Sequence, residues 1–204
     1  MSIPIPAKAT CPVCGQEFEY TMWQSVNTAL PTAREDVISG RLFDVPCPHC
    51  GKTIRIVYPI LYNDLENGMM VYLAPEESLD TVKTAVESIY SSGCRARAVT
   101  DLDHLREKAM ILEAGLDDRV VEIMKLIVKH QIAPQGLGPV EKILFSDRES
   151  PRFEILAGGQ WGIVALDMAD YGKIRDAFSG LLEQEDAAYL IDEAWAQNIL
   201  SSLD

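Results

Sequence analysis

The feature that most constrains this chain is a repeated pentapeptide that contains two cysteines. Residues 11–15 read Cys-Pro-Val-Cys-Gly and residues 47–51 read Cys-Pro-His-Cys-Gly. Four of the five cysteines therefore lie in two Cys-x-x-Cys pairs, and 32 residues separate the pairs. One such turn directs two thiolates at a single ion, and a second turn completes a tetrahedral set of soft ligands. The metal ligands predicted from this repeat are Cys11, Cys14, Cys47 and Cys50.

Zinc is the metal that this ligand set favours. Zn²⁺ binds four cysteine thiolates in closed structural sites, which leave no coordination position for a substrate. Iron is the alternative metal, because the same four sulfurs hold it in rubredoxins, whose knuckles these pentapeptides resemble. A disulfide or a thioredoxin-type redox pair is a third interpretation, but that motif uses one Cys-x-x-Cys at a helix start. We therefore expect one structural zinc ion per chain, with His49 outside a ligand shell that is already complete.

The charge of the chain is acidic and unevenly distributed. The net charge is −13, with five basic and five acidic side chains in residues 1–62 and 13 basic against 26 acidic in residues 63–204. Nucleic-acid binding depends on Lys and Arg neutralising phosphates, and anionic membranes attract the same cations, so both partners are disfavoured. A protein partner, including a second copy of the chain, is compatible with this charge.

The sequence also predicts a compartment. Its first residues lack the basic and apolar segments of a signal peptide, and its apolar runs are too short to span a bilayer. We therefore expect a cytoplasmic protein. Thiols stay reduced there, and paired cysteines then favour a metal over disulfides.

Hydrophobic periodicity predicts an α+β fold. Apolar and polar side chains alternate after each pentapeptide, at residues 16–22 and 52–61, which predicts an N-terminal zinc ribbon built on hairpins. A strand–helix–strand pattern over residues 69–100 predicts a parallel crossover within a mixed sheet packed with helices. Residues 32–35, Thr-Ala-Arg-Glu, form a capping-box signature and predict a short helix that ends at Gly40.

A proline- and glycine-rich segment at residues 133–139 predicts a break in the chain. Two helices are expected before it, and a three-stranded β-meander and two helices after it. We expect a ribbon-plus-α/β domain over residues 1–133 and a C-terminal β-meander and two-helix region over residues 134–204. The alternative is that the meander joins the first sheet.

Other residues with chemical potential have plainer expected roles. Four acid–base groups lie close together in the sequence: Asp101, Asp103, His104 and Glu107. Helix capping and a solvated helix face account for them, and no nucleophile elbow or phosphate-binding loop is present, so no catalytic residue is predicted. Cys94 is expected to be a buried, inert thiol. A stripe expected to face the core, with partner docking as the alternative, consists of Ile191, Trp195 and Ile199.

Several segments beyond the pentapeptides carry a family resemblance. They are Trp23-Gln-Ser-Val-Asn27, Ile38-Ser-Gly-Arg-Leu42, Tyr58-Pro-Ile-Leu-Tyr-Asn-Asp64 and Met69-Met-Val-Tyr-Leu73. Together with the cysteine pairs, they make the chain resemble the bacterial CpXC-domain proteins from residue 9 to about residue 130, with residues 135–204 as an appended part. The resemblance implies the same four cysteine ligands and implies no catalytic residue.

The sequence favours a zinc-binding protein with a structural site that acts as a non-catalytic binding or interaction module. One alternative is an enzyme with an active site in the acidic α/β part. The other is a nucleic-acid-binding zinc ribbon, because residues 1–62 lack the acidic excess.

Overall fold

The computed structural model describes residues 2–90, 94–185 and 188–201. The chain forms two compact units, Met1–Arg106 and Glu107–Asp204. Helices and both parallel and antiparallel strand pairs occur, so the predicted α+β class is confirmed. In the described part of the chain, no helix has the length and apolar character that crossing a membrane requires.

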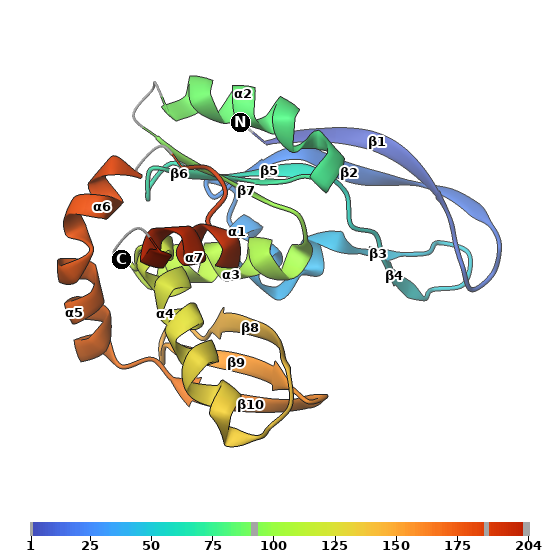
Figure 1. The fold of residues 1–204 in the computed structure, drawn as a ribbon. Coiled ribbons are helices and arrows are strands. Elements are labelled where there is room, and N and C mark those ends of the chain that lie inside the picture. The colour runs from blue at the N-terminus through green and yellow to red at the C-terminus, as the bar shows by residue number, and fades with distance from the viewer. Residues whose placement is uncertain (1, 91–93, 186–187, 202–204) are drawn as a thin grey trace. The chain divides into compact units, whose positions relative to one another are not determined.

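A mixed five-stranded sheet forms the centre of the first unit, in the order β1-β2-β5-β6-β7 (Figure 1). Its strands are β1 (Ile3–Thr10), β2 (Glu17–Asn27), β5 (Ile60–Asp64), β6 (Met69–Leu73) and β7 (Arg95–Val99). The β1–β2 and β5–β6 pairs are antiparallel, whereas β2–β5 and β6–β7 are parallel. The turn η2 (Glu76–Ser78) and helix α2 (Leu79–Tyr90) connect β6 to β7, which confirms the predicted crossover. The sequence also predicts that the crossover helix stops at Gly93, which lies outside the described residues.

Helix α1 (Ala33–Ser39) lies on the opposite side of this sheet from α2 (Figure 1). It ends as predicted, with Gly40 at φ 78° donating its N–H to Val37 O. The predicted capping box is not formed, because the Thr32 side chain makes no capping hydrogen bond. Thr32 has φ −109° and ψ −7°, whereas a capping hydroxyl needs an extended backbone to reach the N–H groups of the first turn.

The strand predicted at residues 52–61 is in fact two strands in different sheets. After the turn η1 (Arg41–Phe43), strand β3 (Asp44–Pro46) pairs with β4 (Thr53–Arg55) in a small hairpin, while β5 begins only at Ile60. Residues 56–59 belong to neither strand, although their burial still alternates. Ile56 N donates to Phe43 O, and the Tyr58 ring packs against buried Phe43 at a centroid distance of 5.1 Å. The intervening segment thereby carries the chain from the hairpin into the large sheet.

The second unit joins helices to a separate three-stranded sheet in the order β10-β9-β8. Its elements are α4 (Asp118–Ile132), η3 (Ala133–Gln135), β8 (Val140–Ser146), β9 (Arg152–Ala157), β10 (Gln160–Ala165), α5 (Met168–Ala177), α6 (Ser179–Gln184) and α7 (Glu193–Ser201). Helix α3 (Leu102–Glu113) begins in the first unit and ends in the second. The predicted meander is confirmed, with antiparallel pairing throughout.

One apolar core runs through the second unit and determines where the chain divides. It joins α4 to the meander and to α7, with Val121, Phe153 and Trp195 among its buried members. The predicted core stripe on the last helix is confirmed, since Ile191, Trp195 and Ile199 are all buried there. The expected domain boundary at residues 133/134 lies inside this unit, because α4 buries its apolar face against the meander that follows it.

Charged groups are also buried in the second unit. Lys125 Nζ lies 3.1 Å from Glu107 Oε2 and 3.0 Å from Glu122 Oε2, and Glu107 Oε1 accepts the N–H of Phe145. Lys108 Nζ forms a 2.9 Å ion pair with Asp118. Because buried charges are stable only when paired and hydrogen-bonded, these contacts fix how α3, α4 and β8 pack.

Candidate metal centre

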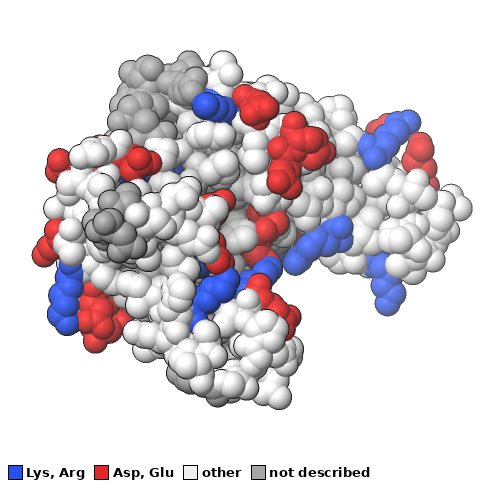
Figure 2. All heavy atoms as spheres, viewed as in Figure 1, with Lys and Arg blue, Asp and Glu red and all other residues white. Residues whose placement is uncertain are grey.

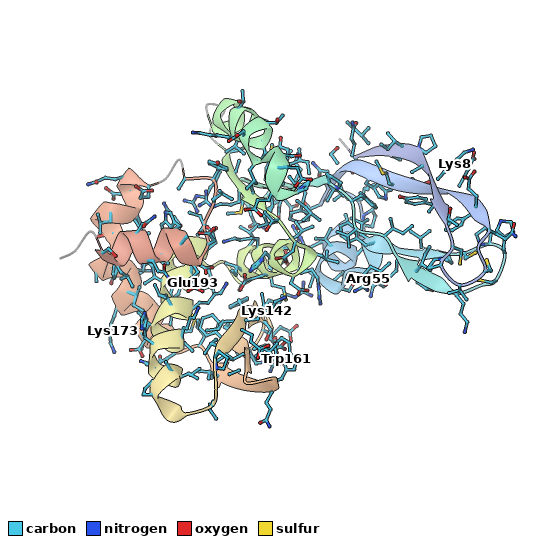
Figure 3. All side chains as sticks on the ribbon, turned by 45° about the vertical axis from the view of Figure 1, so that its right-hand side comes forward. Lys8, Arg55, Lys142, Trp161, Lys173 and Glu193 are labelled. Carbon is cyan, nitrogen blue, oxygen red and sulfur yellow. The ribbon has the colours of Figure 1, made fainter. Side chains whose placement is uncertain are left out.

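Two hairpin tips bring the cysteine pairs together. The first pair lies in the turn between β1 and β2, and the second lies in the turn between β3 and β4. The two tips lie side by side at the right of Figures 1 and 3, where Figure 3 shows their sulfur atoms. Because each hairpin is held by its own strand pairing, the two turns present their thiols from fixed supports.

The two turns have the same backbone structure. Cys11 N donates to Gln16 O and Gly15 N donates to Cys11 O, each at 2.9 Å. The second turn repeats both bonds at 2.9 Å, from Cys47 to Lys52 and from Gly51 to Cys47. Gly15 and Gly51 have φ values of 72° and 69°, a left-handed conformation that favours glycine. The repeated sequence thus encodes a repeated shape, with the glycine required for its backbone angle.

The four Sγ atoms form a compact cluster, within 4.8 Å of one another. Cys11 Sγ lies 3.7 Å from Cys50 Sγ, and Cys14 Sγ lies 3.8 Å from Cys47 Sγ. A tetrahedron with metal–sulfur bonds of about 2.3 Å has edges of about 3.8 Å, so these separations fit four thiolates around one ion. They are far longer than a disulfide bond of about 2.05 Å, and all four cysteines are free.

Apolar side chains from the strands of both hairpins pack against the cysteine cluster. Cys11, Cys47 and Phe18 are buried together, while Cys14 and Cys50 are half-buried. Partly buried side chains that pack against them include Tyr20 of β2 and Ile54 of β4. The sulfurs therefore take the place of a hydrophobic core between two hairpins that are too small to provide one.

Peptide N–H groups and neighbouring thiols set the protonation of the cluster. The N–H of Cys14, assisted by that of Val13, lowers the pKa of Cys11 to about 6 despite burial. The N–H of Gln16 acts in the same direction on Cys14, but burial and the surrounding cysteines raise its pKa to about 12. The pKa of Cys50 is raised in the same way against the N–H of Lys52. Peptide dipoles thus stabilise one negative charge, and holding four thiolates together requires a cation.

Two residues near the motif in sequence lie outside the cluster. His49 Nε2 lies 3.2 Å from Glu17 O, so its ring contacts the other hairpin instead of the sulfurs. Cys94 precedes β7 and is not a member of the cluster. It is half-buried, so the expectation of a fully buried thiol is wrong, because the residue lies just outside the strand.

The acid–base residues of α3 do not form one site. Asp101 Oδ1 accepts the N–H of His104 and its Oδ2 lies 2.6 Å from His104 Nδ1, so Asp101 has the predicted capping role. Arg106 contacts Asp103 at 3.6 Å and donates to Ile38 O. Glu107, by contrast, points into the core of the second unit. Sequence reasoning missed the buried ion pairs of Glu107, although a glutamate between Leu105 and Ala109, both buried, is the signal that would have revealed them.

Comparison with known proteins supports the same site. A family model described as CpXC protein matches residues 9–125, a span that contains all four clustered cysteines. No curated protein and no solved structure matches the chain. The matched span ends inside α4, so residues 126–204 lie outside it. Since the family model covers more than half of the sequence and contains both cysteine pairs, the chain belongs to the CpXC family.

Proposed function

We propose that this chain is a zinc-binding protein in which a closed four-thiolate site stabilises the first unit, and that it acts as a non-catalytic binding module. The observation that carries the proposal is the cluster of the Sγ atoms of Cys11, Cys14, Cys47 and Cys50, which lie within 4.8 Å of one another at separations that suit one ion. Four protein ligands complete the shell of Zn²⁺, so the ion has no open position for water or a substrate. Its role is therefore to join two hairpins.

We favour zinc over iron because a site closed by four protein ligands stabilises the fold and needs no redox chemistry from its metal. Zn²⁺ has no redox chemistry, and its structural sites are closed sets of cysteine or histidine ligands. Binding a structural zinc contributes on the order of 10 kcal/mol to folding in small zinc domains. A reducing compartment, such as the cytoplasm, would keep the four thiols available for the ion.

Nucleic-acid binding by the hairpins is a weaker proposal. Basic side chains of the first unit have acidic partners: Lys8 with Glu17, and Arg55 with Asp44. At the right of Figure 2, over the hairpin tips, basic and acidic residues are intermingled. Phosphate binding needs cations that are available to replace counterions, and paired side chains are less available for this.

Elemental analysis of the purified chain, combined with optical spectroscopy, tests the proposal. We expect close to one zinc per chain and no visible absorption, because Zn²⁺ has a filled d shell. One iron per chain with a visible thiolate-to-iron band would replace zinc by iron. Four free thiols and no metal, after purification under reducing conditions without chelator, would overturn the metal-binding function altogether.

A further inference from the structure

Strand β10 is an edge strand that exposes apolar side chains. It forms one edge of the three-stranded sheet, and all of its residues are exposed. Trp161 and Ile163 keep 59% and 66% of their surface exposed. Figure 3 shows Trp161 on this strand, and β10 itself contains no charged residue, although Glu154 and Arg152 of β9 lie opposite Ile163 and Ala165. Such a patch costs free energy in water unless it is covered.

The backbone of β10 is also available for pairing. Ala157 and Gln160 flank the two-residue turn Gly158-Gly159, and Leu166 N donates to Pro151 O at the other end of the ladder. Hydrogen-bonded and non-hydrogen-bonded pairs alternate between these ends. The N–H and C=O groups that point away from β9 therefore belong to Trp161, Ile163 and Ala165. Among the hydrogen bonds of the described residues, none engages these groups.

The other edges of the two larger sheets carry features that block strand addition. Pro4 and Pro6 in β1 lack an N–H, β7 contains Arg95 and Arg97, and β8 has a register shift beside Lys142. Proline, charge and bulges are the usual means by which edge strands avoid pairing with other chains. Strand β10, Gln-Trp-Gly-Ile-Val-Ala, contains none of these features.

The sequence of β10 is complementary to itself. In an antiparallel pair centred on Ile163, this residue faces Ile163 of the second copy, and Trp161 faces Ala165. All three outward-facing residues then exchange both backbone bonds with their partners, whereas a shift of the centre by one residue leaves one of them unpaired. Large side chains meet small ones on both faces, because Val164 faces Gly162 in the same register. The indole of Trp161 then has room to lie across Ala165 of the second copy.

We propose that β10 pairs antiparallel with β10 of a second copy, which joins two three-stranded sheets into one across a two-fold axis at Ile163. The interface belongs to the second unit and does not depend on the metal centre. It contains no charged residue, although each chain carries a net charge of −13. Repulsion between the rest of the two chains therefore opposes the dimer, and salt, which screens that repulsion, strengthens it.

Sedimentation equilibrium of the metal-loaded full chain tests the dimer. We expect a reversible monomer–dimer equilibrium whose dissociation constant falls as NaCl rises from about 50 to about 500 mM. This change in salt shortens the Debye screening length about threefold. A chain that stays monomeric at all concentrations up to 200 μM in high salt, roughly the range of weak specific association, would overturn the proposal.

Ile163→Lys and Ile163→Glu test the register. Each places two like charges opposite one another at the axis, so each alone should raise the dissociation constant at least tenfold, or by about 1.4 kcal/mol. An equimolar mixture of the two variants should regain the dimer, because Lys then faces Glu. Leu65→Lys is the matched control, since Leu65 is 56% exposed in the first unit and should leave the equilibrium unchanged.

The outcomes separate the specific pair from a general apolar surface. Ile163 is exposed but lies opposite Glu154 on β9, so Ile163→Glu also sets two carboxylates side by side within one chain, whereas Ile163→Lys does not. Circular dichroism and the melting temperature check that each variant stays folded, and a variant that loses the wild-type spectrum is replaced by Ile163→Thr with Trp161→Thr. Two outcomes would contradict pairing at Ile163. Either both charged variants dimerise as tightly as wild type, or each variant alone is monomeric and their mixture forms no dimer. Zinc content remains the separate measure of the metal site, so neither proposal can fail through the other.

Discussion

The Lys125 ammonium and the Glu107 carboxylate meet 3.1 Å apart inside the second unit, with 7% and 1% of their side chains exposed. Glu122 contacts the same ammonium at 3.0 Å. Burial raises the pKa of Glu122 in spite of Lys125 and Lys108, whose charges oppose that change. Both carboxylates form their ion pairs with the one ammonium of Lys125, so this lysine is the sensitive member of the group.

Lys125→Met should strongly destabilise the second unit. It leaves Glu107 and Glu122 buried without their cation, and breaking a buried pair in this way costs about 3–5 kcal/mol. Lys129→Met is the matched control one turn further along α4, because Lys129 pairs with Glu193 at 2.7 Å but at the surface. An exposed pair contributes roughly 0–1 kcal/mol. Urea unfolding followed by circular dichroism measures both, and equal losses would contradict the buried role of Lys125.

Asp117→Asn should change the response of the second unit to acid. Burial raises the pKa of Asp117, but its bonds to Arg119 outweigh burial and the net pKa is lowered below 3.8. The charged form is thus stabilised in the folded state, and this contribution is present above pH 3.8 and is lost as pH falls through the folded pKa.

The variant keeps an N-cap, since asparagine also caps helices, but it loses the charged contact. We expect it to be about 1–3 kcal/mol less stable than wild type at pH 7. The difference should shrink as pH falls below 3.8, as measured by urea unfolding across pH. Asp170→Asn, which changes an exposed pair with Lys173, is the control. A difference that stays constant with pH would show that the Asp117 charge is not responsible.

Cys47→Ser should release the metal and unfold the hairpins, while the second unit keeps its own core. Cys94→Ser makes the same chemical change outside the cluster and should retain the metal. Metal content and amide hydrogen exchange, read separately for the two units, check both expectations. Simultaneous loss of protection in both units would mean that they unfold as one cooperative structure.

Gly51→Ala should weaken the metal site through the backbone alone. A Cβ at Gly51 has open space, but the residue has φ 69°, and this conformation costs an L-residue about 1–2 kcal/mol. The variant should therefore lose its metal to a chelator at a lower chelator concentration than wild type. Gly172→Ala in α5 also adds its Cβ in open space, without a positive φ, and should stabilise the helix by about 0.5–1 kcal/mol. Equal metal retention by Gly51→Ala and wild type would show that the site does not require glycine at position 51.

The parts of the fold that the sequence predicts are those with local signals. The cysteine turns, the crossover around α2 and the meander each have a short motif or a clear period, and all three are found. Strand β1 was not predicted, because Pro4 and Pro6 are not typical of a strand. Proline is tolerated at that edge, where its nitrogen faces no strand partner.

Non-local packing accounts for what the sequence does not reveal. Residues 52–61 alternate like one strand, and this pattern does not reveal that β4 ends at Arg55 and that β5, in another sheet, begins at Ile60. The division of the chain likewise depends on α4, whose apolar face has the same pattern whichever sheet covers it. The ion pair of Lys108 with Asp118 joins two helices that each look amphipathic alone, and no periodicity reports such a partner.

The order in which the core of the second unit is assembled has a consequence for synthesis on the ribosome. The hairpins and their four thiols are synthesised before the second unit, and domains generally fold in order as the chain emerges. Lys108 and Val121 gain their partners later. The acceptor Ile191 O and the buried Trp195 are synthesised about 70 residues after α4 begins. A nascent chain therefore passes through a stage in which the four thiols are present while α7 does not yet cover the apolar face of α4, and exposed apolar surface of this kind favours aggregation.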